Sequence, residues 1–396
     1  MRHTLRILSA AIVAVTLTVG AAAAHEKPAA AGVLAIDLYS QGETLDFLEA
    51  VVAGEGVELR HRRSTDGGRT WTPAVPIDTG SAGIHRPYRG SEPQVAALDD
   101  RLVAMWTAPG TSEWGSGPLA TATSSDGGRT WRPGPAPVDN GSHIAHGYVE
   151  LVVDGGGRFH AVWLDGRSGR QALHTALSRD GGATWEKNRT IDDGACTCCW
   201  NRAISMTADS VHVIYRDDTP RDLAVAVTND GGDHWSRLGR AGAFDWEFDG
   251  CPGVGGALAL TREEDQSSLH ALAWTGTEGK AGLYVMTSKD LGRTWSEPSS
   301  FGGAGAHKGD FAAAGATLAA AWDVLGERGR SVVAAVSRDA GRSWSEPLRL
   351  SEPGVNATQP LVAEAADGFL AVWTERADGG EEVTWKMRRF RDARSR

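Results

Sequence analysis

An octapeptide that occurs six times is the feature of this sequence that most constrains its fold. It reads SSDGGRTW at residues 124–131, with close copies such as STDGGRTW at 64–71 and SRDGGATW at 178–185. The aspartates of the copies are Asp66, Asp126, Asp180, Asp230, Asp290 and Asp339. They recur roughly 50 to 60 residues apart, which is the period of a propeller blade rather than of a helical repeat. The spacing therefore predicts a single array of β-sheets.

Apolar runs with the alternation of β-strands accompany each copy. One run upstream ends near an aromatic residue, as in LVAMW at 102–106, and a second leads directly into the octapeptide, as in DLAVAV at 222–227. We expect blades of four strands, a to d, with the octapeptide at the turn between c and d. There the aspartate accepts hydrogen bonds from backbone N–H groups, and glycine supplies the positive φ of a tight turn. The octapeptide is thus predicted to be scaffold, not a binding site.

The number of b strands predicts the number of blades. Six of these strands end at Trp106, Trp163, Tyr215, Trp274, Trp322 and Trp373, and LDFLEAVV at 45–52 makes a seventh. The last unit, from residue 357 onward, has a, b and c strands but no octapeptide. We predict seven blades; a ring of six, in which the N-terminal unit completes the last blade, is the alternative.

The octapeptides resemble the Asp-box (BNR) repeats of sialidases and of the wider superfamily of Asp-box propellers. The resemblance covers nearly all of the chain beyond its N-terminal segment, and it implies an all-β, sialidase-type β-propeller. It is specific for the fold and weak for the activity, because many Asp-box proteins are not sialidases.

The resemblance also implies which side chains a sialidase would need. Members with that activity bind the substrate carboxylate with three arginines, and they use a tyrosine nucleophile paired with a glutamate and an aspartate as acid/base. Arginine suits the first task because its planar fork binds a carboxylate in a bidentate way. The first arginine has no counterpart near Val33, whereas Arg216 or Arg221 fits the second position and Arg330 the third.

The nucleophile and its partner are missing from the matching positions. Asn201, followed by Arg202, stands where the family has its glutamate, and Gln359 stands where it has its tyrosine. Asp37 and Asp165 are acid/base candidates without a supporting motif. Two arginines without tyrosine and glutamate do not make a sialidase, so we expect background turnover of a sialoside.

The distinctive residues of the chain gather in loops that a propeller brings to one face. The d-to-a and b-to-c connections share that face, and they contain CTCCWNR at 196–202 and DWEFDGC at 245–251. Aromatic rings such as Tyr88 and Trp114 could stack on sugars there. The ligand-binding candidates are Arg89, Arg202, Arg216, Arg221, Arg330, Trp200, Trp246 and Gln359. Their concentration favours a carbohydrate or another anionic ligand on this loop face.

All four cysteines of the chain belong to the same loops: Cys196, Cys198, Cys199 and Cys251. In an oxidising compartment they most simply form two disulfides, for example from Cys251 to one of the three others and a tight bridge within the trio, but the sequence does not fix the pairing. The alternative is a copper or zinc site that combines these thiolates with histidines. Its histidine candidates are His85, His143, His146 and His307. The spacing of CTCC differs from that of common zinc sites, so we favour disulfides and no cofactor.

The N-terminal segment and the charge set the expected location and partners. Arg2 and Arg6, the apolar run 7–19 and the stretch GAAAAH predict a signal peptide over residues 1–24. We expect a linker at 25–32, a single propeller at 33–396, and a secreted or periplasmic monomer without a transmembrane segment. The net charge of −10 and the scattered basic residues exclude a nucleic-acid groove. A binding function therefore leads, ahead of an exo-sialidase or other glycoside hydrolase with an altered site, and of a copper- or zinc-binding propeller.

Overall fold

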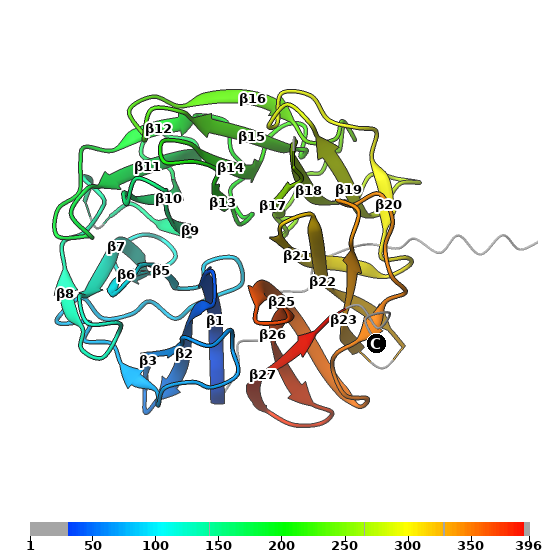
Figure 1. Ribbon diagram of the computed structural model, residues 1–396. Helices are drawn as coiled ribbons and strands as arrows, with labels where there is room; N and C mark the ends of the chain where they lie inside the picture. Colours follow the sequence, from blue (N-terminus) through cyan, green and yellow to red (C-terminus); the bar gives the residue numbers. More distant parts are fainter. Residues whose placement is uncertain (1–30, 142, 265, 328, 392–396) are drawn as a thin grey trace, which may run out of the picture.

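The computed structural model describes residues 31–391, apart from residues 142, 265 and 328. Its strands form five antiparallel sheets of four strands and one sheet of seven. The sheet of seven contains the first four strands and the last three, so the described chain makes seven blades arranged in a ring (Figure 1). The predicted sialidase-type propeller is confirmed, with seven blades instead of six.

The strands follow one another around the ring in the order of the sequence, the first of each blade being innermost (Figure 1). Blade 1 has β1 (Ala31–Gln41), β2 (Thr44–Ala53), β3 (Gly56–Ser64) and β4 (Val75–Pro76); blade 2 has β5 (Gln94–Leu98), β6 (Arg101–Pro109), β7 (Ser116–Ser124) and β8 (Arg132–Gly134); blade 3 has β9 (His146–Val153), β10 (Phe159–Asp165), β11 (Ala172–Ser178) and β12 (Arg189–Asp192); blade 4 has β13 (Arg202–Ser205), β14 (Val211–Arg216), β15 (Leu223–Thr228) and β16 (Ser236–Arg240). Blade 5 has β17 (Gly256–Arg262), β18 (Ser267–Thr275), β19 (Gly282–Ser288) and β20 (Ser299–Phe301); blade 6 has β21 (Ala306–Ala314), β22 (Thr317–Gly326), β23 (Gly329–Ser337) and β24 (Leu348–Arg349); blade 7 has β25 (Val355–Ala365), β26 (Gly368–Ala377) and β27 (Glu382–Phe390).

The ring closes where the start of β1 meets β27. Ala31 and Gly32 pair in parallel with Glu382 and Val383, and this pairing joins blades 7 and 1 into one sheet. Gly32 has a φ of +83°, and a Cβ on it would lie 2.1 Å from the carbonyl oxygen of Val383. Blade 7 therefore has three strands of its own, and the N-terminal residues take the outer position beside β27.

The N-terminal boundary of the fold lies at the start of β1. This strand begins at Ala31, two residues before the predicted start of the propeller. The predicted signal peptide, 1–24, and residues 25–30 of the predicted linker lie outside the described residues. In the part of the chain that the structure describes, no helix is long and apolar enough to cross a membrane.

Each octapeptide forms the turn between the third and fourth strands of its blade, as predicted. In blade 2, Oδ1 of Asp126 accepts the backbone N–H groups of Arg129 at 3.0 Å and Thr130 at 2.9 Å. The Oγ1 of Thr130 donates to Oδ2 of the same aspartate at 2.7 Å. Gly128 donates its N–H to Oγ of Ser124 at 2.9 Å. The residues repeated in the octapeptides are therefore those that form the hydrogen bonds of the turn.

The octapeptides also fix how neighbouring blades pack. Gly128 of blade 2 has a φ of +80°, and a Cβ there would lie 2.1 Å from the ring of His61 in blade 1. The indole of Trp131 meets the same histidine ring edge-on, with 5.3 Å between centroids. Glycine thus allows the two sheets to approach closely, and the tryptophan ring fills the space between them.

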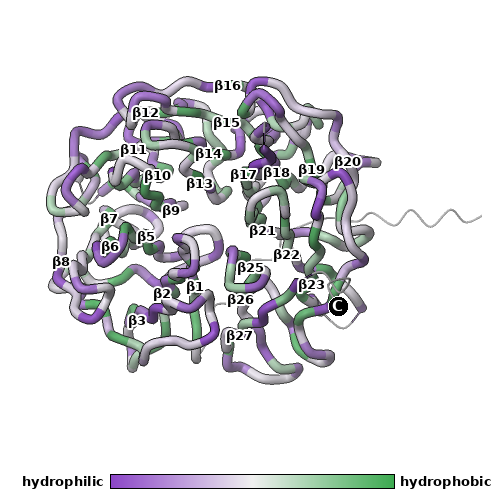
Figure 2. Tube along the Cα trace, in the orientation of Figure 1, coloured by the Kyte–Doolittle hydropathy of each residue, from purple (hydrophilic) through white to green (hydrophobic). Residues whose placement is uncertain are grey.

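Burial falls from the middle of each blade toward the outer edge. The second strands are almost entirely buried, as in β10 and β14, whereas the fourth strands β8 and β24 are largely exposed. Figure 2 shows hydrophilic residues along much of the outer rim, near β16 and β20. The core therefore lies between the sheets, and the loops at the inner strand ends are left to build a site.

Candidate functional site

A cavity of about 60 Å³ lies where the inner strands of the ring converge. Its walls come from blades 1, 2, 3, 4, 6 and 7. The wall residues that matter for its chemistry are Arg89, Trp200, Asn201, Arg202, Asp310 and Gln359. Residues far apart in the sequence therefore meet at one point, as the loop-face argument predicts.

The size of the cavity limits what it can hold. Sites that enclose a whole small molecule usually measure roughly 300 Å³ or more, whereas one ordered water needs only about 10 to 15 Å³. The cavity at 60 Å³ has room for a few waters or one substituent of a ligand. The rest of a larger ligand would lie on the surrounding loops.

Four of the eight predicted ligand-binding candidates line the cavity: Arg89, Trp200, Arg202 and Gln359. Gln359 has a φ of +57°, in the left-handed region that non-glycine residues rarely adopt. It lies at an irregularity in the pairing of β25 with β26, and its Nε2 donates to Oε1 of Glu92 at 3.2 Å. The position where a sialidase would have its tyrosine is thus part of the wall, with an amide in place of the phenol.

Arg202 lies among three buried carboxylates at the base of the wall. Its Nη1 is 3.1 Å from Oε2 of Glu150. Burial disfavours the guanidinium charge, but Glu150, Asp310 and Asp37 outweigh this effect and raise the pKa of Arg202 above its ordinary value. Burial in turn raises the pKa of Glu150 to about 7 and that of Asp37 to about 6, even though Arg202 opposes both shifts.

These three carboxylates share a structural task. Each lies on the inner strand of one blade and accepts a backbone N–H from the inner strand of the next. The bonds are Val95 N to Asp37 at 2.8 Å, Ala203 N to Glu150 at 3.1 Å, and Val362 N to Asp310 at 3.0 Å. The raised pKa values therefore belong to joints between blades, and burial is enough to explain them without a catalytic role.

Two tyrosines, Tyr88 and Tyr148, lie next to residues of the cavity wall. Tyr88 and Tyr148 meet edge-on, with 5.8 Å between ring centroids. Burial raises the pKa of both phenols above the ordinary value. A tyrosine nucleophile needs a neighbouring base that helps to remove its proton, so the environment of these two rings acts against sialidase chemistry.

The other four candidates lie away from the cavity wall. Arg216 is 2% exposed, and its guanidinium donates to the carbonyl oxygens of Val254 at 2.9 Å, Trp274 at 2.9 Å and Arg221. It also lies over the ring of Trp246 at 5.1 Å. Its donors are thus used by the protein itself. Arg221 contacts a cysteine, described below.

Arg330 in blade 6 also binds a group of the protein itself. Its Nη1 lies 2.8 Å from Oδ1 of Asp323, a carboxylate with no exposed surface. Thr358 donates to Oδ2 of the same carboxylate at 2.6 Å. The arginines that match the second and third positions of the sialidase triad therefore serve as internal ties.

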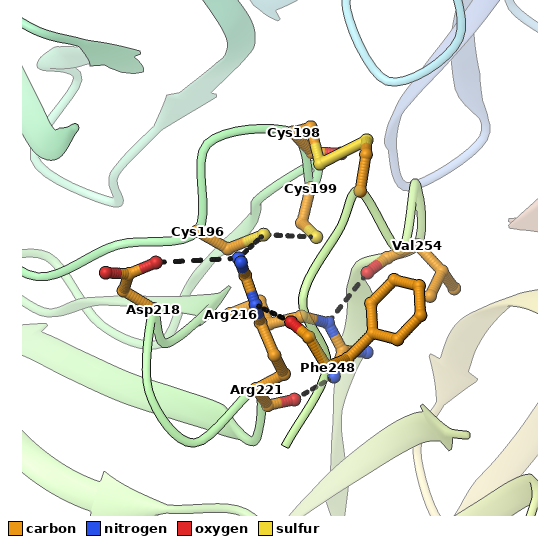
Figure 3. The surroundings of a disulfide bond; sticks show 9 residues. Cys196, Cys198, Cys199, Arg216, Asp218, Arg221, Phe248 and Val254 are labelled. Carbon is orange, nitrogen blue, oxygen red and sulfur yellow. Dashed lines mark hydrogen bonds and ion pairs between the residues drawn. A yellow bond between two sulfur atoms is a disulfide. The ribbon is translucent and has the colours of Figure 1, made fainter. Parts of the chain in front are cut away.

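The cysteines form one cluster, which packs against Tyr148 (Figure 3). Cys198 and Cys251 form a disulfide, which joins the loop before β13 to the loop before β17. Cys196 and Cys199 are buried thiols with their sulfurs 2.8 Å apart. Nη1 of Arg221 lies 3.1 Å from the sulfur of Cys196. The structure thus contains one of the two expected disulfides and brings the other two sulfurs together.

The four histidines proposed as metal ligands lie elsewhere. His146 contacts Asn140 at 2.7 Å, His85 contacts the carbonyl of Trp114 at 3.2 Å, and His307 packs against the ring of Trp274. His143 is exposed in the loop before β9. Among the described residues, the one group of potential ligand atoms close enough to share an ion consists of Cys196, Cys198 and Cys199. The residues expected for a mixed cysteine–histidine site are therefore not brought together.

Asn201 is one of the cavity residues that the list of candidates omitted. Its Nδ2 donates to the carbonyl of Tyr148 at 2.9 Å, and its Oδ1 is buried with no hydrogen-bond partner. Buried acceptors without partners are uncommon in native proteins. The sequence carried a signal for it, because the resemblance to sialidases implies a functional position at Asn201, between Trp200 and Arg202.

Comparison with known proteins agrees with the fold. The sequence profile of the BNR repeat-like domain matches residues 53–301, more than half of the chain. The chain belongs to the BNR repeat-like family. No curated protein sequence matches it.

Solved structures of family-like propellers show the same fold. A Hadza microbial sialidase, Hz136, superposes with a TM-score of 0.52 and 16% identity, over 85% of this chain and 74% of that one. The α-L-arabinofuranosidase Arb93A of Fusarium graminearum superposes with a TM-score of 0.52 and 14% identity, over 80% of this chain and 94% of that one. At such identities the likeness shows the fold alone.

Proposed function

We propose that this BNR repeat-like propeller binds a carbohydrate, with one substituent of the sugar in the central cavity and the sugar ring on the loops around it. The observation that carries the proposal is the convergence of Arg89, Trp200, Asn201 and Gln359, from blades 2, 4 and 7, in the wall of the central cavity. Amide and guanidinium groups supply the donors and acceptors that bind sugar hydroxyls, and the indole of Trp200 supplies an apolar face. We also propose that the protein acts after export, because its N-terminal residues have the pattern of a signal peptide.

The neighbours of Asn201 suit the same ligand. Trp200 offers part of its ring beside the cavity, and Arg89 and Gln359 place polar groups around it. Saturated sugar rings pack on aromatic faces, while directional donors and acceptors choose among their hydroxyl groups. The mixture of Arg202 with Glu92 and Asp310 gives the wall both signs of charge, which favours a neutral or singly charged sugar.

Binding fits the site better than hydrolysis does. The carboxylates nearest to Arg202 join the blades, and the adjacent tyrosines have raised pKa values. We therefore expect background hydrolysis of 4-methylumbelliferyl sialoside and of 4-methylumbelliferyl arabinofuranoside. Turnover that disappears in a Glu150→Gln variant with native stability would contradict the binding proposal and establish a hydrolase.

A calorimetric titration with defined sugars tests the proposal. N-acetylneuraminic acid, methyl α-L-arabinofuranoside and methyl β-D-galactoside supply singly charged and neutral probes. For the sugar that binds, Trp200→Ala and Asn201→Ala should each weaken binding at least tenfold, because they remove the stacking surface and the acceptor. Trp114→Ala is the matched control: this tryptophan is 76% exposed and lies outside the cavity wall. Equal losses in the control and in Trp200→Ala, or binding of no sugar on a broad glycan array, would refute the proposal.

A further inference from the structure

The two unpaired cysteines have the C-x-x-C spacing of a redox motif, which the comparison of CTCC with zinc sites overlooked. Cys196 and Cys199 are three residues apart, so they form a C-x-x-C pair, and Cys198 stands between them. Their sulfurs lie 2.8 Å apart and both side chains are 1% exposed. A buried pair of thiols next to a disulfide is an unusual combination, and neither the fold nor the proposed sugar site requires it.

The surroundings of Cys196 favour its thiolate form. Cys199 donates a hydrogen bond to its sulfur, which lowers the pKa of Cys196 below the ordinary value against the effect of burial. The guanidinium of Arg221 lies 3.1 Å from the same sulfur and acts in the same direction (Figure 3). Burial and the neighbouring sulfur raise the pKa of Cys199. The cluster therefore distinguishes one nucleophilic sulfur from one that remains protonated.

The nucleophilic sulfur lies within reach of the disulfide. The sulfurs of Cys196, Cys198 and Cys199 all lie within 4.8 Å of one another, and Cys198 is bonded to Cys251. Exposure increases along this series: 1% at Cys196, 9% at Cys198, and an intermediate value at Cys251. A reaction that begins at the buried thiolate can therefore release a sulfur at the loop surface.

We propose that the four cysteines form one thiol–disulfide exchange site that delivers a reactive thiol to the loop face at Cys251. The thiolate of Cys196 attacks the sulfur of Cys198, and the Cys196–Cys198 bond forms as the Cys198–Cys251 bond breaks. Cys251 leaves with the electron pair and takes up a proton. The protein as a whole is neither oxidised nor reduced in this step. The released thiol is the group that would react with a disulfide-containing partner.

The exchange also changes the support of the sugar site. The Cys198–Cys251 bond holds the loop that contains Trp200 to the loop before β17. In the exchanged form this tie is gone, and the new bond lies within the segment 196–198. Trp200 then depends on its packing alone.

Labelling of the folded protein tests the proposal. The protein is reduced with limiting dithiothreitol until two thiols per chain are counted after unfolding, and then treated under native conditions with a bulky maleimide–polyethylene glycol. We expect the label at Cys251, together with a Cys196–Cys198 disulfide in the peptide map. Cys196→Ser should slow the labelling of Cys251 at least tenfold. Cys199→Ala, which removes the hydrogen bond to the attacking sulfur, should also slow it. Trp114→Ala is the control, because this side chain is 76% exposed and lies outside the cysteine cluster; it should leave the labelling rate unchanged.

Other outcomes would overturn the exchange site. Labelling of Cys251 at the same rate in Cys196→Ser would show that its bridge opens without the buried thiolate. An unlabelled wild-type protein, with Cys196 and Cys199 recovered as thiols after unfolding, would show a static cluster. One equivalent of copper or zinc in the purified protein, with Cys251 reactive only after chelation, would replace exchange by a metal site. Thermal melts of each variant confirm that it is folded.

Discussion

At the scale of single residues, the aspartates of the octapeptides show how a short motif stabilises a fold. Hydrogen bonds from Thr130, first from its side chain and then from its backbone, lower the pKa of Asp126 to about 2. The carboxylate is close to the surface. It therefore stabilises the protein by accepting the N–H groups of the turn, and not through the interaction of a buried charge. It accepts hydrogen bonds from four donors in three residues: Ser124, Arg129 and Thr130.

We expect Asp126→Ala to reduce the free energy of unfolding by about 1 to 2 kcal/mol, because the turn donors lose their acceptor. Sugar affinity of the folded protein should not change, since the turn lies at the end of the blade opposite the cavity. Urea unfolding and a sugar titration measure the two effects. Arg129→Ala, which removes an exposed side chain from the same turn, should cost less than about 0.5 kcal/mol.

His307 also makes stability depend on pH, and its contribution is likewise lost as the pH falls. Burial lowers its pKa to about 3, despite the attraction of Asp323. An unfolded histidine has a pKa of about 6.5, so the unfolded chain takes up a proton first and the contribution of His307 to stability is lost as the pH falls below about 6.5. His307→Gln should remove about 2 kcal/mol of the loss between pH 7 and pH 5. The same difference in His143→Gln, at an exposed position, would refute this assignment.

At the scale of elements, buried charged side chains connect neighbouring blades by hydrogen bonds to backbone groups. Arg216 at the end of β14 donates to carbonyls of the loop before β17 and of β18, and thereby connects blade 4 to blade 5. Asp37, Glu150 and Asp310 make the equivalent connection elsewhere with single backbone bonds. Buried charges of this kind are retained because the surrounding backbone depends on them.

We predict that Arg216→Ala lowers the free energy of unfolding by about 3 kcal/mol or more, because it leaves buried carbonyl groups without donors. Urea unfolding measures the loss. Arg170→Ala is the control, because its side chain is 62% exposed and pairs with an exposed aspartate; it should change stability by less than about 0.5 kcal/mol. Loss of sugar affinity in folded Arg216→Ala, at unchanged stability, would instead return Arg216 to the ligand site.

The same elements show why the sequence predicted the fold better than the site. The turn residues around Asp126 and the alternation of β6 and β10 are local patterns, and local patterns repeat visibly along the chain. The convergence of Arg89, Trp200 and Gln359 followed from the topology of a propeller. In contrast, the internal ties of Arg216 and the orphan oxygen of Asn201 depend on loop conformations that no local pattern specifies.

At the scale of the whole molecule, the ring closes between blades 7 and 1 through two backbone residue pairs and a shared apolar cluster that includes Phe47 and Val372. Every other pair of successive blades is also linked through the chain itself. The closure requires glycine, since a Cβ at residue 32 would meet the backbone of Val383. Blade 7 is thus completed by residues that belong to blade 1.

We expect Gly32→Ala to lower the melting temperature by several degrees and to speed amide hydrogen exchange in β1 and β27, because the added methyl group separates the two strands. Gly42→Ala is the matched control, since Gly42 also has a positive φ, +62°, but nothing lies within 4 Å of its added Cβ. It reports the backbone strain alone, about 1 kcal/mol. Equal effects of both substitutions would show that the closure does not need the close approach.

The short pairing of β1 with β27 gives the ring a seam. Unfolding that starts at this junction can proceed one blade at a time in either direction. A blade in the middle of the chain is instead connected covalently to a folded blade on each side. Blade 4 lies farthest along the chain from the seam, and the Cys198–Cys251 bridge encloses it. Limited proteolysis should therefore trim the protein from the seam inward and leave a resistant fragment centred on blade 4.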